Sequence, residues 1–305
     1  MSGARVCAIS VDLDEIHHYY AIHGLAAPAA AHPVYDRALP RYRDFATAHG
    51  IPLTLFAVGS DLDRAANGLT LRSWAAQGHE LGNHSFDHWY DLSRRAPEQM
   101  RDQIARASDA IYEHTGERPR GFRAPGYTMS DGLYAALAEL GLDYSSSLFP
   151  CPYYYFAKLA KLGQLRLRGA PSQSIASGPE VLLSARTPHR VGHPYWRAGS
   201  GVLELPIQVT ARLRLPVIGT SLMLLGPELA RRLVRGLTRE AFVNLELHGI
   251  DLLDTSDLLA ELAPHQFVLR VSLERKRQTL SAVVQELRAH GFSFTRLDEA
   301  ARRFQ

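Results

Sequence analysis

Cysteine is scarce in this chain. Only Cys7 and Cys151 occur among 305 residues. A small secreted domain held together by disulfides needs several paired cysteines, so this count excludes a disulfide framework. Cys7 lies in the first apolar run, where a free thiol behaves as a small buried hydrophobic group. The cysteine content therefore fits a protein of a reducing compartment.

Long apolar runs and strong charge are also lacking. The longest apolar stretch, residues 215–226, is broken by proline, glycine and hydroxyl side chains and is too short to cross a bilayer. The net charge of +3, from 34 basic and 31 acidic side chains, is too mild for a nucleic-acid-binding protein, which carries a clustered basic face. Residues 1–5 lead directly into a strand pattern without the apolar core of a secretory signal. We therefore expect a soluble cytoplasmic protein without a nucleic-acid partner, provided that the chain is complete.

Short apolar runs alternate with helical patterns along most of the chain. Strands are expected at 6–11, 53–58, 80–83, 120–123, around 144, and at 202–209, 241–247 and 292–296, and helices at 35–49, 69–77, 97–115, 131–140, 227–237, 273–290 and 297–303. This alternation predicts βαβ units with parallel strands. Between 149 and 201 repeated prolines break the regularity, so we expect a long irregular insertion there. The whole chain, 1–305, is expected to form one domain.

Two segments carry side chains that suit a metal ion. His84 and His88 lie four residues apart in His-Ser-Phe-Asp-His, a spacing at which two imidazoles can converge on one ion. Near the N-terminus, an apolar strand ends in Asp12 and Asp14, which point the same way because strand side chains alternate faces. One carboxylate can complete the metal site and the other can stay free as a base. Two histidines and an aspartate with open positions are typical of a zinc ion that activates water.

The candidate residues share one position relative to the expected strands. Asp12, Asp14, His84, Arg123 and His248 all fall at or just beyond the C-terminal end of a strand. In α/β barrels this face carries the active site. The sequence thus predicts that residues far apart in the chain meet at one edge of the sheet.

Four motifs in order resemble the polysaccharide deacetylase family, the NodB-homology group of carbohydrate esterases. They are Ser-Val-Asp-Leu-Asp at 10–14, His-Ser-Phe-Asp-His at 84–88, Phe-Arg-Ala-Pro-Gly-Tyr at 122–127 and Leu-His-Gly at 247–249. The resemblance implies an α/β fold, an irregular and incomplete (β/α) barrel. The first and third motifs are similar to a branch with atypical peptidoglycan deacetylases, allantoinase-like amidohydrolases and lipid-linked aminosugar deformylases.

The resemblance also implies roles for single residues. Asp12 matches the catalytic base, His248 the general acid and Arg123 the arginine that orients the base. Asp14, His84 and His88 match the ligands of one divalent metal, expected to be Zn²⁺, with Co²⁺, Ni²⁺ and Fe²⁺ as alternatives for the same ligands.

Further residues have smaller expected roles. Gly126 and Tyr127 of the third motif are candidate substrate contacts, and Trp196 and Glu204 are the nearest candidates for a fourth motif of the family. Asp87 is expected to orient the metal ligands, and Asp251 to orient His248, without contacting the metal or the substrate.

Three functions stay open at this point. The leading one is metal-dependent removal of an acetyl or formyl group from an amino sugar, free or carried on a lipid. The apolar and arginine-rich stretch 212–239 would then suit contact with an anionic membrane surface. The alternatives are an allantoinase-like hydrolase of a small cyclic amide and an inactive glycan-binding relative. The sequence leaves the oligomeric state open.

Overall fold

The computed structural model describes residues 5–28, 31–167, 169, 172–257 and 259–305. Within them, nine strands form one curled, open sheet with the order β6-β7-β5-β4-β3-β2-β1-β8, and β9 pairs with β1 outside this path. The strands are β1 (Arg5–Asp12), β2 (Thr54–Ala57), β3 (Glu80–Asn83), β4 (Gly121–Phe122), β5 (Tyr144–Ser145), β6 (His189–Val191), β7 (Ala198–Glu204), β8 (Phe242–His248) and β9 (Phe292–Thr295). Only β6 and β7 pair in antiparallel fashion among these described strands. The expected α/β half-barrel is confirmed.

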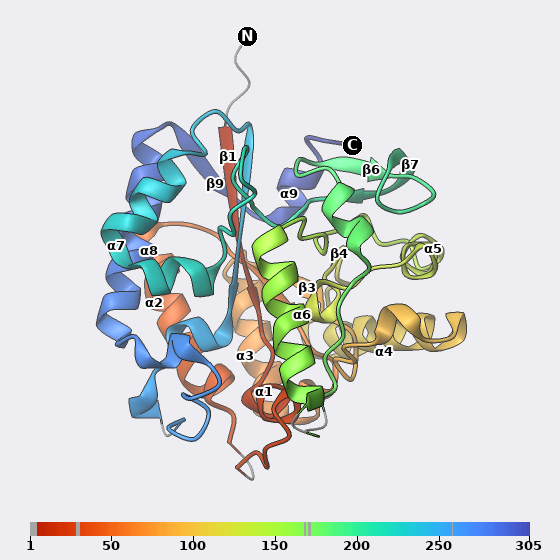
Figure 1. The fold of residues 1–305 in the computed structure, drawn as a ribbon, viewed down its shortest axis with the longest axis horizontal. Helices are drawn as coiled ribbons and strands as arrows, with labels where there is room; N and C mark the ends of the chain where they lie inside the picture. Colours follow the sequence, from red (N-terminus) through yellow and green to blue (C-terminus); the bar gives the residue numbers. More distant parts are fainter. Residues whose placement is uncertain (1–4, 29–30, 168, 170–171, 258) are drawn as a thin grey trace.

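Helices cover the sheet (Figure 1). They are α1 (Ile16–Ile22), α2 (Leu39–His49), α3 (Ala65–Ala76), α4 (Pro97–Thr115), α5 (Asp131–Glu139), α6 (Pro152–Leu167), α7 (Gly219–Arg235), α8 (Leu273–Ala289) and α9 (Leu297–Ala301). Helix α7 packs on α8, α3 on α4, and α4 on α5. In Figure 1, β1 runs between α7 on the left and α6 on the right.

The main core fills the space between the central strands and their helices. Ile9 and Val11 of β1 and Leu245 and Leu247 of β8 are buried in one apolar cluster with Val283 of α8. Each fully buried side chain of this size contributes about 1.5–3 kcal/mol relative to exposure. This packing fixes β1 and β8 side by side, in the register that pairs Asp12 with His248.

Helix α4 shows how the sequence sets an element. Pro97 occupies its first turn, where a missing N–H has no helical partner to lose. Met100, Ile104 and Ile111 lie at helical spacing on its buried face. The helix ends at Gly116, whose φ of 79° is a left-handed conformation that glycine adopts without strain. The expected bounds, 97–115, are those observed.

The expected irregular insertion at 149–201 is partly wrong. It contains α6, a 16-residue helix, and the antiparallel strands β6 and β7 begin near its end. Leu165 is the only buried residue of helix α6. Its other apolar side chains are partly or largely exposed, so the helix lacks the buried apolar face whose repeat is recognised in sequence. The single-domain assignment stays a prediction.

Two further helices differ from expectation. Helix α1 directly follows the first motif and was not expected. Helix α7 begins at Gly219 rather than at Pro227, and Gly226 (φ 74°) forms a kink inside it. Among the described residues, no helix is long and apolar enough to span a membrane.

Candidate active site

The parallel sheet brings the motif residues together. Asp12 ends β1 and lies opposite His248 at the end of β8. His84 directly follows β3 and Arg123 directly follows β4. Backbone hydrogen bonds continue the ladder one residue beyond the strands, from His84 N–H to the Ala57 carbonyl and from Arg123 N–H to the Asn83 carbonyl. Side chains from four strands thus meet at one edge of the sheet, as the sequence predicts.

Asp14, His84 and His88 form a buried cluster, called here the metal triad. Nε2 of His84 lies 3.0 Å from Oδ1 of Asp14, and Nε2 of His88 lies 3.3 Å from Oδ2. Two ligand atoms bound to one zinc ion at a tetrahedral angle lie roughly 3.4 Å apart, because each bond is about 2.0–2.1 Å. The three side chains therefore fit a divalent ion between them.

The orientation of His84 supports this fit. Its Nδ1 lies 2.8 Å from the Arg123 carbonyl oxygen. A carbonyl only accepts, so Nδ1 carries the hydrogen and Nε2 keeps its lone pair facing Asp14. Oδ1 of Asp14 and both ring nitrogens of His88 are buried without a hydrogen bond among the described residues. Buried polar atoms normally have partners, so these atoms are suited to bind a ligand from outside the described residues.

The loop that carries the two histidines is held in a strained conformation. Ser85 and His88 have φ values of 64° and 53°, which residues other than glycine rarely adopt. The Asn83 side chain accepts from the Ser85 N–H, and the predicted supporting residue Asp87 binds Gln103 of α4 through both its N–H and its carboxylate. Such conformations cost about 1–3 kcal/mol each and persist where the surroundings impose them, typically at functional sites. Asp87 thus anchors the loop to α4.

Asp12 stands beside the metal triad with one oxygen free. Its Oδ1 accepts from Nη1 of the fully buried Arg123 at 2.7 Å. Its Oδ2 makes no hydrogen bond among the described residues and lies 3.8 Å from Nε2 of His84. Arg123 is fixed in turn by Ser146, which accepts from it through its carbonyl at 2.6 Å and its hydroxyl at 2.8 Å. Burial raises the pKa of Asp12, and the neighbouring guanidinium opposes that rise.

His248 is paired with a residue that the motifs did not reveal. Oε1 of the fully buried Glu246 lies 2.8 Å from Nδ1 of His248. Burial alone would lower the pKa of His248, but the nearby carboxylates, Glu246 first and then Asp12 and Asp14, together raise that pKa well above its usual value. The sequence could have indicated this pair, because Glu246 and His248 are two residues apart in a strand and such residues share a face. We call Asp12, Glu246 and His248 the proton-transfer triad.

Asp251 has a different place from the one expected. Its carboxylate accepts from the backbone N–H of His248 at 2.9 Å rather than from the ring. It thereby closes the short 3-10 turn Gly249–Leu252 that follows β8. The structure puts Glu246, not Asp251, against the imidazole.

The predicted substrate contacts divide into two groups. Gly126 and Tyr127 lie at the site, since the Tyr127 hydroxyl is 3.3 Å from Nε2 of His248. Glu204 is fully buried, with Oε1 accepting from two backbone N–H groups and Oε2 from the Tyr134 hydroxyl, so it has no oxygen left for a substrate. Trp196 packs edge-on against Tyr195 in an apolar cluster that contains neither triad.

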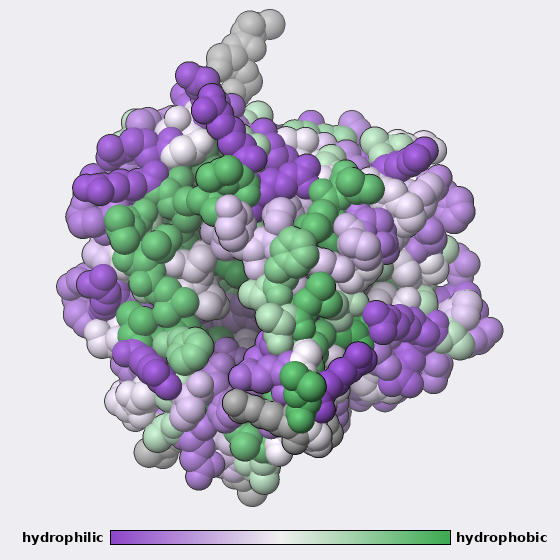
Figure 2. Space-filling model, in the orientation of Figure 1, coloured by the Kyte–Doolittle hydropathy of each residue, from purple (hydrophilic) through white to green (hydrophobic). Residues whose placement is uncertain are grey.

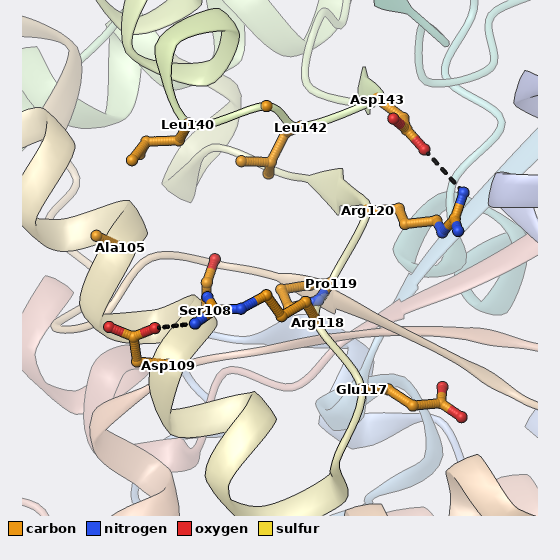
Figure 3. Close-up of a pocket in the computed structure, with 11 residues that line it drawn as sticks. Ala105, Ser108, Asp109, Glu117, Arg118, Pro119, Arg120, Leu140, Leu142 and Asp143 are labelled. Atoms are coloured by element: carbon orange, nitrogen blue, oxygen red, sulfur yellow. Dashed lines mark hydrogen bonds and ion pairs between the residues drawn. The ribbon is translucent and has the colours of Figure 1, made fainter.

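A surface cavity of about 600 Å³ lies elsewhere (Figure 3). It is lined by Pro119 and Arg120, which precede β4, and by Asp143, which precedes β5. It therefore opens at the N-terminal ends of these strands, whereas ligands of parallel α/β sheets bind at the C-terminal ends. Four of its five charged side chains are already paired, Arg118 with Asp109 and Arg120 with Asp143.

Comparison with known proteins agrees with this geometry. Residues 33–145 match the family model described as polysaccharide deacetylase. The likeness to the polysaccharide deacetylase family covers these residues, a little over a third of the chain. The match includes His84, His88 and Arg123 but neither Asp12, Asp14 nor His248, so the places of the latter three rest on the first and last motifs and on the structure.

Curated relatives cover the same part of the chain. A chitooligosaccharide deacetylase of Bradyrhizobium sp. is 35% identical over 104 residues, 34% of this chain and 46% of the relative. A peptidoglycan deacetylase of Helicobacter pylori is 27% identical over 119 residues, 38% of this chain and 40% of the relative. The chain spans less than half the length of these polysaccharide deacetylase relatives.

Solved structures share the fold over nearly the whole chain. A candidate polysaccharide deacetylase from Mycobacterium smegmatis superposes with a TM-score of 0.62 at 16% identity, covering 99% of this chain and 91% of its own. A CE4 family pseudoenzyme from Bacillus anthracis gives 0.52 at 11% identity, covering 99% and 66%. At these identities the likeness shows the fold alone, and activity has to be argued from the site.

Proposed function

We propose that this chain hydrolyses the N-acyl group, acetyl or formyl, of an amino sugar in a metal-dependent reaction. The observation that carries the proposal is the free Oδ2 of Asp12, next to the metal triad and in register with His248. Relatives named as chitooligosaccharide and peptidoglycan deacetylases support an N-acetylated sugar as the substrate class.

Asp14, His84 and His88 would hold the divalent ion. When bound, the ion would act as a Lewis acid on the amide carbonyl and make a neighbouring water easier to deprotonate. Two imidazoles and a carboxylate suit Zn²⁺ best, and Co²⁺, Ni²⁺ or Fe²⁺ accept the same ligands. Oδ1 of Asp14 and both ring nitrogens of His88 make no hydrogen bond among the described residues, which leaves them ready for that role.

Asp12 serves as the general base in this proposal. Its Oδ2 can take a proton from the attacking water, while Arg123 holds Oδ1 and keeps the carboxylate aligned. Ser146 fixes the guanidinium on its far side, so the carboxylate cannot turn away. The base is thus oriented before substrate arrives.

His248 serves as the general acid. The Glu246 carboxylate keeps its ring protonated at neutral pH, as the raised pKa requires. Nδ1–H stays with Glu246, and Nε2–H can be donated to the sugar nitrogen as the carbon–nitrogen bond breaks. The Tyr127 hydroxyl, 3.3 Å from Nε2, marks where that proton points.

We further propose that the amino sugar is carried on a lipid at an anionic membrane surface on the cytoplasmic side. Figure 2 shows apolar strips over α7 and α6 on either side of a hollow. Exposed apolar side chains include Tyr153, Phe156, Leu159 and Leu167 of α6, Leu213 before α7 and Leu224 within it. Neither 144–179 nor 205–227 contains an acidic residue, although the chain has 31 in 305. Apolar surface without negative charge suits lipid tails beneath anionic headgroups.

Acyl release from defined substrates tests the chemistry. Purified protein would be given N-acetyl and N-formyl amino sugars, with and without a lipid carrier, while acetate, formate and bound metal are measured. Release in the wild type that fails in Asp12→Asn with metal retained supports the proposal. Bound metal without release from any sugar would shift the assignment to a cyclic amide substrate. No metal uptake would leave the inactive glycan-binding alternative.

Vesicle binding tests the membrane contact separately. Leu224→Glu and Phe156→Glu each place a charge on an exposed apolar side chain, 51% and 61% accessible. Both are expected to reduce flotation with anionic vesicles while release from a soluble sugar is unchanged. The matched control is Leu69→Glu, since Leu69 of α3 is 62% exposed and lies outside both segments. Equal loss in the control, or no loss in either variant, would contradict the membrane contact.

A further inference from the structure

A second cluster of metal-ligating side chains stands beside the metal triad. It consists of His17 and His18 at the start of α1 and Asp61 in the 3-10 turn Ser60–Asp63 between β2 and α3. Nε2 of His17 lies 3.6 Å from Oδ1 of Asp61, and Nε2 of His18 lies 3.7 Å from Oδ2. The two clusters touch, because the rings of His18 and His88 pack with centroids 4.6 Å apart.

These distances do not describe ordinary ion pairs. A hydrogen-bonded imidazole and carboxylate lie about 2.7–3.0 Å apart, shorter than either distance here. Ligand atoms that share a tetrahedral zinc ion lie roughly 3.4 Å apart. At 3.6 and 3.7 Å, the second cluster is closer to the spacing of ligand atoms around one ion than to that of a hydrogen bond.

The convergence of the two histidines is itself unusual. Neighbouring residues of a helix point about 100° apart, because an α-helix has 3.6 residues per turn, and so do not normally face one partner. Here both rings turn toward the same carboxylate, with centroids only 4.0 Å apart. Nε2 of His18 and Oδ2 of Asp61 are buried and make no hydrogen bond among the described residues. Asp61 is only 5% exposed, so an uncompensated charge on it is costly.

The backbone on both sides of the second cluster is fixed. Glu15 caps α1, accepting from the N–H groups of Ile16 at 2.8 Å and Val34 at 3.1 Å. The Asp61 carbonyl accepts from the Asn67 side chain at 2.7 Å. The three ligands are thus presented by anchored segments that follow neighbouring strands, β1 and β2.

We propose that His17, His18 and Asp61 bind a second divalent transition-metal ion next to the one expected at the metal triad. His17 is 44% exposed, so the remaining coordination position of this ion faces solvent. The ligand set, two imidazoles and one carboxylate, is the same as in the metal triad. A first-row divalent ion such as Zn²⁺ or Co²⁺ is therefore its occupant.

Metal stoichiometry tests the second site without reference to activity. Metal-free protein would be equilibrated by dialysis with Zn²⁺ at micromolar free concentration and the bound metal measured per chain. The wild type is expected to bind two ions, one for each cluster. Asp61→Asn and His17→Ala should each bind one, as should His84→Ala, and the double variant His84→Ala/Asp61→Asn should bind none. His193→Ala is the matched control, since this exposed histidine also lies near a carboxylate, 3.2 Å from Asp131, and should leave both ions bound.

A crystal soaked in Zn²⁺ gives an independent reading at the zinc absorption edge. An anomalous peak enclosed by His17, His18 and Asp61 would support the second site. One ion in the wild type that is unaffected by Asp61→Asn, together with a peak at the metal triad alone, would overturn it. That result would leave the proposed deacylase activity standing. Conversely, a protein that binds two ions but releases no acyl group would support the second site and contradict the proposed activity.

Discussion

The metal triad and the proton-transfer triad are built from the same residue types but differ in what surrounds them. In the metal triad, Oδ1 of Asp14 and both ring nitrogens of His88 make no hydrogen bond among the described residues, and Asp14 faces the two imidazoles and no arginine or lysine there. In the proton-transfer triad, the ring of His248 is engaged at both nitrogens, and Asp12 is paired with the buried cation Arg123. A positive charge already 2.7 Å from a carboxylate disfavours a metal ion there.

The roles proposed for these side chains therefore depend on the neighbouring groups and not on residue type alone. Arg123 serves both sides at once, since its carbonyl orients His84 while its guanidinium holds Asp12. One residue after β4 thus sets the ligand geometry of the metal triad and the ionisation of the base. Variants that keep Arg123 in place should therefore act on one triad and leave the other measurable.

The largest expected effect follows loss of a metal ligand. His84→Ala removes one of three ligands and should abolish metal binding at the metal triad. Activity should fall roughly 10³-fold or more, because the ion supplies several kcal/mol of stabilisation to the transition state. Metal analysis and acyl release measure the two losses together. His193→Ala, on an exposed residue, should change neither, and normal activity in His84→Ala would exclude the metal triad from the reaction.

Asp12→Asn should separate chemistry from metal binding. Asparagine keeps an oxygen for Arg123 but cannot take a proton from water, so activity should fall roughly 10²- to 10⁴-fold. The metal content should stay at the wild-type value, because Oδ2 lies 3.8 Å from His84 and is not needed by the metal triad. Loss of the metal in this variant would make Asp12 a ligand instead of the base.

Glu246→Gln should change the pH dependence more than the maximal rate. The Glu246 carboxylate raises the pKa of His248, so the acid stays protonated as pH rises through neutrality. Without that charge the pKa falls, and the alkaline limb of the kcat profile should move to lower pH. At neutral pH the rate should drop by roughly 10-fold to 100-fold.

Glu204→Gln is the matched control for this shift. Both glutamates are fully buried at or near strand ends, but Glu204 accepts hydrogen bonds from Ser147, Leu148 and Tyr134 and not from an imidazole. Its substitution should lower the free energy of unfolding by about 1–3 kcal/mol, because buried donors lose a charged partner. The pH profile should stay in place. A profile that moves equally in both variants would contradict the role of Glu246.

Much of the fold could be predicted because its elements bury regular patterns. The bounds of α4 agree with the expected ones because its buried face repeats at helical spacing. Those of β3 also agree, although all four of its residues are buried. Helix α6 could not be predicted in this way, because its exposed face is as apolar as its packed side. The period of apolar residues in a sequence follows the buried face of an element. A helix that exposes leucine and phenylalanine does not show this period.

Only the site residues that belong to the four sequence motifs could be predicted. Asp12, Asp14, His84, His88, Arg123 and His248 were expected together, and the structure brings them to one edge of the sheet. The motifs do not include Glu246, which lies inside an apolar strand. Strand alternation alone places it on the same face as His248. The pairing of His17 and His18 with Asp61 depends on the side-by-side placement of β1 and β2, which residue spacing alone does not give.

The smallest expected effect is that of Tyr127→Phe. The hydroxyl lies 3.3 Å from Nε2 of His248, at the nitrogen that would donate the proton, and the ring packs on Phe149 and Tyr154. Phenylalanine keeps that packing and removes one hydrogen bond worth about 0.5–1.5 kcal/mol, which corresponds to roughly a 2- to 12-fold fall in kcat/KM. Because the carboxylate that raises the pKa of His248 remains, the alkaline limb should not move. A fall in rate without a shift in pH would make Tyr127 a residue that positions the acid, whereas a shift like that of Glu246→Gln would make it part of the group that controls the proton.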